Sequence, residues 1–152
     1  MYRVWVMMAA ALMGFYGIVA WLGFRADLGS AKHHIASAFF LVVTILFVHS
    51  LCMFYMIGSG RAVREAIEEK VWCGPWLKRI RSMRMKCFPW ALLAMAAGVL
   101  AAWVGAGAHT CVTTTMTHRV TAILSLAVNL FACVVEYAQL RANSWMIAEL
   151  NE

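Results

Sequence analysis

Four long apolar stretches set the limits on what this chain can fold into. They run over 4–24, 34–57, 88–107 and 120–140. At about 1.5 Å per residue, each is long enough as a helix to cross the roughly 30 Å hydrocarbon core of a bilayer. Backbone polar groups find no water in lipid, so such segments must bond internally as helices. We therefore expect an all-α fold, a four-span transmembrane helical bundle.

The overall composition agrees with that expectation. Hydrophobic residues make up 64% of the chain and charged residues 13%, and the mean hydropathy is +0.76, values typical of integral membrane proteins. Four spans use most of the 152 residues. We therefore predict one integral membrane domain over 1–152 without a soluble catalytic domain, so that any chemistry lies within the bundle or at its rims.

The basic residues indicate how the chain is oriented in the membrane. Ten of the thirteen Lys and Arg residues belong to Arg3, the connection after the second span and Arg141, all on one side of a four-span topology. Only Arg25, Lys32 and Arg119 lie on the other. The positive-inside rule then predicts cytoplasmic termini and a cytoplasmic long connection, and we expect a bacterial inner membrane. The net charge of +6 is thus a topology signal, and no nucleic acid partner is expected.

The long connection, 58–87, is predicted as a basic cytoplasmic loop. A turn is expected at Cys73–Trp76, after a short amphipathic loop helix. Beyond the turn, apolar and basic residues alternate, which favours a segment lying on the membrane against anionic lipid headgroups, or against an acidic partner. The lipid- or partner-facing residues of this segment are Lys78, Arg79, Arg81, Arg84 and Lys86. The last residues, 141–152, are expected to form a cytoplasmic helical extension.

The fourth span carries polar residues at a helical interval. At about 100° per residue, His118, Ser125, Asn129 and Glu136 fall on one face. A helix that turned this stripe toward lipid would leave each polar group without a partner. We therefore predict that the stripe faces the interior of the bundle.

Two histidines at one depth suggest a cofactor. His34 and His118 each begin a span on the outer side, and a b-type haem in a membrane bundle is commonly held by two histidines on neighbouring helices. His33 and His109 are spare candidates. An alternative is a soft metal such as copper bound at this rim by imidazole with the sulfur atoms of Cys111 and Met116. Histidines that only bond water are the simpler interpretation.

A second pair of ionisable residues lies deeper. His49 and Glu136 are predicted near the inner ends of the second and fourth spans, where an ionisable group is costly without a partner. If they meet, they could relay protons or hold a quinone headgroup. The alternative is a packing contact between helices, worth on the order of 1 kcal/mol.

The two halves of the chain share a weak pattern. Aligning His34 with His118 pairs Ser37 with Thr121, and a gap of two residues then pairs Trp21 with Trp103. The bundle could therefore consist of two related helical hairpins.

Taken together, these features predict the class of protein more sharply than its function. The expected role is that of a non-catalytic accessory or assembly subunit, packed against other membrane protein subunits in a larger complex. The alternative is a haem-b electron-transfer subunit with His34 and His118 as ligands, which would belong to a membrane oxidoreductase complex. A proton or quinone site at His49 and Glu136 is the third hypothesis.

Overall fold

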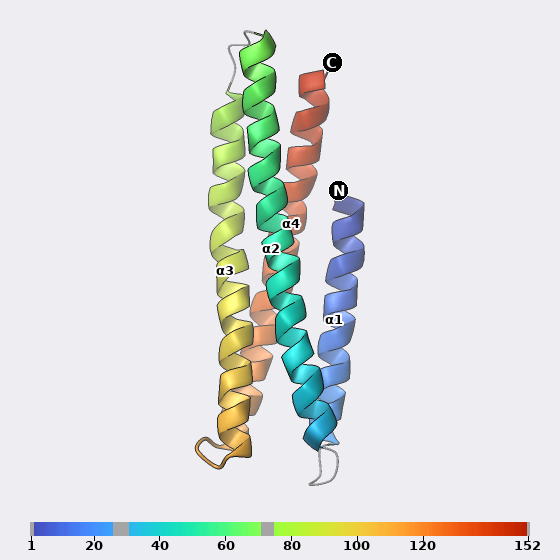
Figure 1. The fold of residues 1–152 in the computed structure, drawn as a ribbon, viewed down its shortest axis with the longest axis vertical. Coiled ribbons are helices and arrows are strands. Elements are labelled where there is room, and N and C mark those ends of the chain that lie inside the picture. Colours follow the sequence, from blue (N-terminus) through green and yellow to red (C-terminus); the bar gives the residue numbers. More distant parts are fainter. Residues whose placement is uncertain (1, 26–30, 71–74, 152) are drawn as a thin grey trace.

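The computed structural model describes residues 2–25, 31–70 and 75–151 and is helical almost throughout. Its four helices are α1 (Tyr2–Phe24), α2 (Ala31–Lys70), α3 (Trp76–His109) and α4 (Thr115–Asn151) (Figure 1). All four are long and apolar enough to cross a membrane. The expected all-α architecture with four membrane-spanning helices is confirmed, as is the integral membrane class.

The segment predicted as a loop, 58–87, differs from expectation. Helix α2 continues without a break to Lys70, and α3 already begins at Trp76. The amphipathic stretch after Gly58 is therefore the end of a long helix, not a separate one, and the basic stretch after the turn runs along the bundle instead of across the membrane surface (Figure 1). Of the predicted turn, Cys73 and Gly74 lie outside the described residues, and Trp76 is already the first residue of α3.

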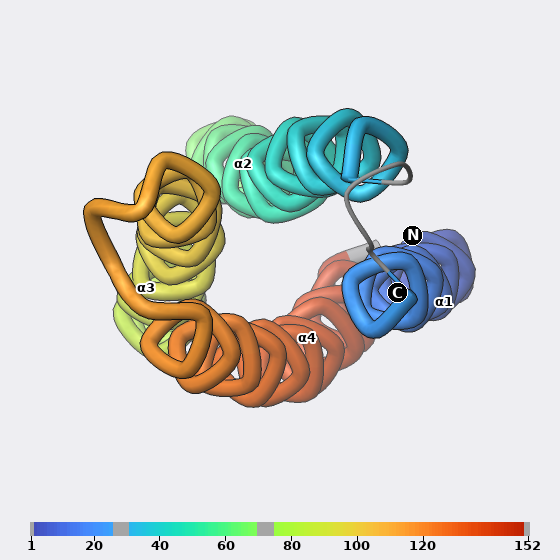
Figure 2. The backbone as a smooth tube through the Cα atoms, turned by 90° about the horizontal axis from the view of Figure 1, so that it is seen from below, coloured from blue at the N-terminus to red at the C-terminus, as the bar shows by residue number. Residues whose placement is uncertain are grey.

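The helices form a ring in chain order. Seen from the end, α2 lies between α1 and α3, and α4 closes the ring between α3 and α1 (Figure 2). Helix α1 is much shorter than the others, so only α2, α3 and α4 continue past its N-terminal end (Figure 1). At about 1.5 Å per residue, α2 alone is roughly 60 Å long, about twice the hydrocarbon thickness. We call the part beyond α1, namely 58–70, 76–87 and 141–151, the three-helix extension.

The exposed and buried side chains of the bundle are arranged as in a protein that spans a membrane. Large apolar side chains point outward, among them Phe54 at 68% exposure and Trp103 at 75%. The interior combines an apolar core with buried polar side chains: His49, Asn129 and Glu136 are all 0% exposed. Because lipid solvates apolar groups and leaves polar groups unpaired, this arrangement is stable in a membrane and would be unfavourable in water.

The small residues of α3 allow close helix packing. Ala91 and Ala94 are fully buried, and a methyl group added to Gly98 would lie 2.8 Å from Cδ1 of Ile45 on α2. Backbones that approach this closely gain van der Waals contact without large side chains. The small residues of this helix that lie inside the bundle are thus used for packing within the chain.

The turn between α3 and α4 is a Schellman motif with an unusual residue. The Val112 amide donates to the Gly107 carbonyl at 2.8 Å, and the Cys111 amide donates to Ala108 at 3.4 Å, the two bonds that define this helix end. The motif requires a left-handed backbone at Cys111, where φ is 60°. Glycine is the usual residue at this position because it has no Cβ to strain.

Candidate functional site: an outer histidine pair and a buried polar network

The outer end of the bundle brings together the two histidines that the sequence pairs. The imidazole rings of His34 and His118 lie edge to face, with centroids 6.1 Å apart and planes at 65°. Both side chains are half-buried. The spare candidates His33 and His109 are exposed and take no part in this ring contact.

The protein fixes the tautomer of one ring. His34 Nδ1 lies 3.1 Å from the backbone carbonyl of Val19 on α1. A carbonyl only accepts, so Nδ1 carries the hydrogen and donates it. The other nitrogen, Nε2, then has a free lone pair when the ring is neutral. This is the state in which a histidine binds a metal, with its second nitrogen held by an outer partner.

Two glycines leave the space that the imidazole rings of His34 and His118 occupy. A methyl group added to Gly23 on α1 would lie 2.9 Å from Cε1 of His34, and one added to Gly105 on α3 would lie 2.7 Å from Cε1 of His118. Any larger residue would therefore push the imidazole away. Each histidine is placed against the bare backbone of the preceding helix.

The surroundings of the two rings are similar in part. Gly23 and Gly105 fall opposite each other in the same two-residue gap alignment that pairs Trp21 with Trp103. In each case the backbone of the residue four places before the glycine faces the ring. The Val19 carbonyl accepts a hydrogen bond from His34, and the backbone of Ala101 interacts with His118. His118 Nδ1 itself has no hydrogen bond of good geometry.

Deeper in the bundle, the second predicted pair is in direct contact. His49 Nδ1 lies 2.9 Å from Glu136 Oε1, and both residues are 0% exposed. His49 Nε2 lies 3.1 Å from the side-chain oxygen of Asn129. The imidazole of α2 is therefore held between two side chains of the polar stripe on α4.

The hydrogen bonds of Asn129 decide the protonation of this network. Its amide nitrogen donates to the carbonyls of Ala94 at 3.2 Å and Ser125 at 2.9 Å, so its oxygen must face His49. Since that oxygen only accepts, His49 Nε2 carries a hydrogen. The remaining proton lies between His49 Nδ1 and Glu136 Oε1. Either placement leaves the pair with no net charge, which suits a low-dielectric interior.

The stripe also bonds to α1. The Tyr16 hydroxyl and Ser125 Oγ are 3.0 Å apart, and the indole N–H of Trp5 donates to the Cys133 carbonyl at 3.4 Å. Ser125 is buried, as are Asn129 and Glu136. The polar face of the fourth span thus lies inside the bundle, where it joins α1, α2 and α3 to α4.

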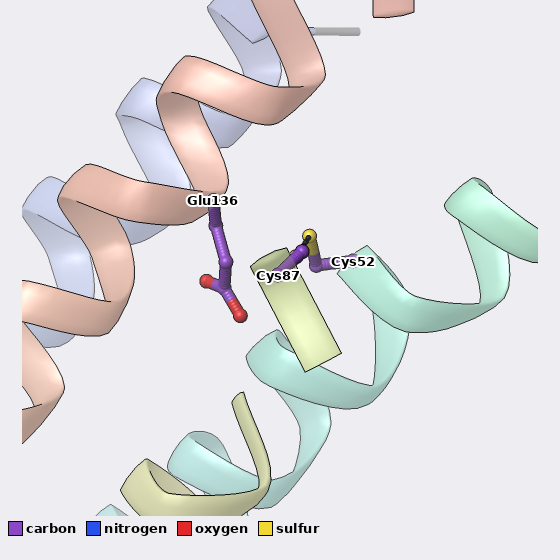
Figure 3. A group of neighbouring side chains, drawn as sticks. All are labelled: Cys52, Cys87 and Glu136. Atoms are coloured by element: carbon purple, nitrogen blue, oxygen red, sulfur yellow. Dashed lines mark hydrogen bonds between the residues drawn. The ribbon is translucent and has the colours of Figure 1, made fainter. Parts of the chain in front are cut away.

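Sequence reasoning did not bring together the two cysteines beside this network. Cys52 on α2 and Cys87 on α3 are both buried, with sulfur atoms 3.8 Å apart, and the Glu136 carboxyl lies beside them (Figure 3). Cys52 follows His49 by three residues and shares its helix face, which was a usable signal. Cys87 was assigned to the end of a loop, and a loop residue has no predicted helix face, so no such signal existed for it.

The candidate ligands of a soft metal at the outer rim do not come together. Cys111 and Met116 are exposed, as are His33 and His109. Where residues are described, the His, Cys and carboxylate donors that gather within ligand distance are those of Cys52, Cys87 and Glu136.

Four basic residues of segment 58–87, which was predicted as a loop, line a groove between α2 and α3. Arg64 and Gly60 line it from α2, and Lys78, Arg81 and Arg84 line it from α3. Arg84 donates to the carbonyls of Met56 and Ile57 at 2.9 to 3.1 Å. Two further basic residues of this segment lie on the exposed surface: Arg79, which pairs with Glu149 of α4 at 2.9 Å, and Lys86.

Comparison with protein-family models, with curated proteins and with solved structures found nothing significantly similar to this chain.

Proposed function

We propose that this chain is an integral membrane electron-transfer subunit that binds a b-type haem between His34 and His118. The main observation behind this proposal is the distance of 6.1 Å between the ring centroids of the two histidines. Two imidazoles that share one iron at about 2.0 Å per bond, as in other metal–imidazole bonds, have centroids about 6.3 Å apart. The separation of the two rings thus matches what is expected if both imidazoles held one iron.

The surroundings of the rings support the same proposal. The Val19 carbonyl holds Nδ1 of His34 and leaves Nε2 free to bind iron. The glycines that contact the rings keep side chains away from the pair. In sequence, Lys32 and Arg119 flank the two histidines, and such cations suit the propionates of a haem. When bound, the haem would supply one-electron chemistry, and the protein would supply ligands, orientation and a low-dielectric surrounding.

An electron carrier exchanges electrons with other proteins, so the proposal retains the role of a subunit in a larger membrane complex. It replaces the purely structural accessory role because the histidine pair is more specific than packing requires. We further propose that the chain derives from two related hairpins, each contributing one ligand. We also propose a bacterial inner membrane, and the basic residues alone support the proposal that both termini lie in the cytoplasm.

We assign the His49–Glu136 pair a structural role in this proposal. Both side chains are 0% exposed, and both imidazole nitrogens are bonded within the protein. A quinone headgroup or a proton pathway needs access to at least one of them. A buried pair whose imidazole nitrogens are both bonded is better suited to fixing the register of α2 against α4.

The test is an absorption spectrum of the full chain, purified in mild detergent from cells with sufficient haem. We expect a Soret band and, after dithionite reduction, a sharp α band. His34→Ala and His118→Ala should each abolish both bands, while His33→Ala, a matched change at the adjacent exposed position, should retain them. Absence of haem from the wild-type chain, or its retention in the first two variants, would overturn the proposal. The accessory role would then be tested by whether the 17.0 kDa chain copurifies with other subunits.

We also propose that the groove between α2 and α3 binds anionic lipid headgroups. Four basic side chains line it, and it lies at the start of the three-helix extension, next to the membrane-spanning part. Arg64→Gln with Arg81→Gln should weaken binding to phosphatidylglycerol vesicles and leave the weak binding to phosphatidylcholine unchanged. The control is Arg61→Gln, a change at an exposed residue of the same helix that pairs with Glu65. Equal binding by the variant and the wild type would refute this assignment.

A further inference from the structure

We infer that Cys52, Cys87 and Glu136 form a buried binding site for a divalent metal ion that prefers thiolate ligands, zinc in particular. The three residues come from α2, α3 and α4, and one donor atom of each lies within 4.8 Å of the other two (Figure 3). All three are at most 2% exposed. This site is separate from the histidine pair and does not depend on the proposed haem.

The spacing of the sulfur atoms fits a tetrahedral ion. Cys52 Sγ and Cys87 Sγ are 3.8 Å apart. Two thiolates bound to zinc at about 2.3 Å with a tetrahedral angle are separated by about 3.8 Å. A disulfide would need the sulfurs about 2.05 Å apart. The two side chains are therefore already placed as ligands of one ion.

Glu136 provides the second, independent observation. Its Oε1 contacts His49, but Oε2 has no hydrogen-bond partner although the residue is 0% exposed. A buried carboxyl oxygen without a partner is costly. A cation between this carboxyl and the two thiols would remove the cost.

The residues next to the site hold its carboxylate ligand in place through hydrogen bonds. His49 holds Glu136 through Oε1, and Asn129 holds His49 in turn. Partners of this kind orient a ligating carboxylate and raise its affinity. These hydrogen bonds extend from the metal site across α4 to the Ala94 carbonyl on α3.

The charges of the assembled site balance. Binding a divalent ion releases the protons of both thiols, and the two thiolates then neutralise the ion. The remaining proton of the network stays between His49 Nδ1 and Glu136 Oε1, so this pair adds no net charge. The site is thus neutral as a whole, as burial at this depth requires. A monovalent copper ion would leave one uncompensated negative charge, so the balance favours a divalent ion.

The test is the metal content of the full chain after purification in detergent and dialysis, measured by mass spectrometry. We expect about one zinc per wild-type chain. The double variant Cys52→Ser/Cys87→Ser should lose at least nine-tenths of it, and Glu136→Gln should bind at least tenfold more weakly. Cys111→Ser, the same change at an exposed cysteine, should retain zinc. Zinc retained in the double variant, or no more zinc in the wild type than in that variant, would overturn the inference.

A second measurement decides the matter if the double variant fails to fold. In a chain with Cys73, Cys111 and Cys133 replaced by serine, Cys52 and Cys87 are the remaining cysteines. Cobalt(II) added to this metal-free variant should give thiolate-to-cobalt charge-transfer absorption, because that band arises only from a direct sulfur–cobalt bond. Stoichiometric zinc should remove it. Cobalt binding without the band, or no binding, would overturn the inference independently of any haem spectrum.

Discussion

Replacing His49 with leucine is expected to be one of the most damaging single changes in the membrane-spanning bundle. His49 contacts Glu136 at 2.9 Å and Asn129 at 3.1 Å, and all three residues are 0% exposed. Leucine is apolar and offers neither contact. The Glu136 carboxyl would then be buried with no hydrogen-bond partner on either oxygen, since Oε2 already has none.

The size of the effect distinguishes two descriptions of the pair. If His49 and Glu136 formed an ordinary polar contact between membrane helices, its loss would cost about 1 kcal/mol. Breaking a buried ion pair by removing one partner costs about 3–5 kcal/mol, because the other charge stays behind. We expect the larger value. The double variant His49→Leu/Glu136→Leu should lose at least about 2 kcal/mol less than the sum of the single changes.

The assay is reversible unfolding of the metal-free protein in mixed micelles, followed by circular dichroism as dodecyl sulfate is added. His33→Leu, an exposed histidine on the same helix, is the control and should change the free energy of unfolding by less than about 0.5 kcal/mol. A loss below about 1 kcal/mol for His49→Leu, or strict additivity in the double variant, would refute the buried ion pair.

Four further substitutions test single features of the bundle. Gly58→Ala should raise the free energy of unfolding by up to about 1 kcal/mol, because nothing lies within 4 Å of the added methyl and alanine favours the helix. Gly60→Ala should lower it by about 1–2 kcal/mol, because its methyl would displace the Arg84 guanidinium from the α2 carbonyls. Cys111→Gly should raise it by about 0.5–1 kcal/mol by relieving the left-handed backbone. Asn143→Leu should raise it by about 1–2 kcal/mol, because the buried amide has no hydrogen-bond partner.

The same unfolding assay measures these four changes, and the two glycine substitutions serve as each other's control. Effects of the same sign at Gly58 and Gly60 would contradict the role given to Arg84. A less stable Cys111→Gly protein would show that the thiol makes a contact that outweighs the backbone strain. A less stable Asn143→Leu protein would mean that the amide is satisfied within the three-helix extension.

The membrane-spanning character of the chain follows from local sequence. An apolar stretch of sufficient length must be a helix in lipid, wherever its neighbours lie. The inward direction of the polar stripe on the fourth span follows as well, because Ser125, Asn129 and Glu136 share one face and only the interior offers them partners. These predictions need no knowledge of the other helices.

The helix ends could not be read in the same way. Gly58 and Pro89 are local signals for a boundary, yet α2 and α3 both continue past them. The continuation is stabilised by packing in the three-helix extension, where Val63, Ile80 and Met146 are buried together. Tertiary contacts of this kind outweigh a local preference of about 1 kcal/mol per glycine.

What the sequence determined by itself was therefore the fold class, the four spans and the polar face of the fourth, since each depends on one helix and its solvent. The tertiary structure decided which side chains meet: His34 with His118 across the outer rim, His49 with Glu136 and Asn129, and Cys52 with Cys87. Helical periodicity gives the direction of a side chain about its own axis but carries no information on the rotation and depth of the neighbouring helix. Only the packed bundle sets these two quantities, and the candidate sites depend on both.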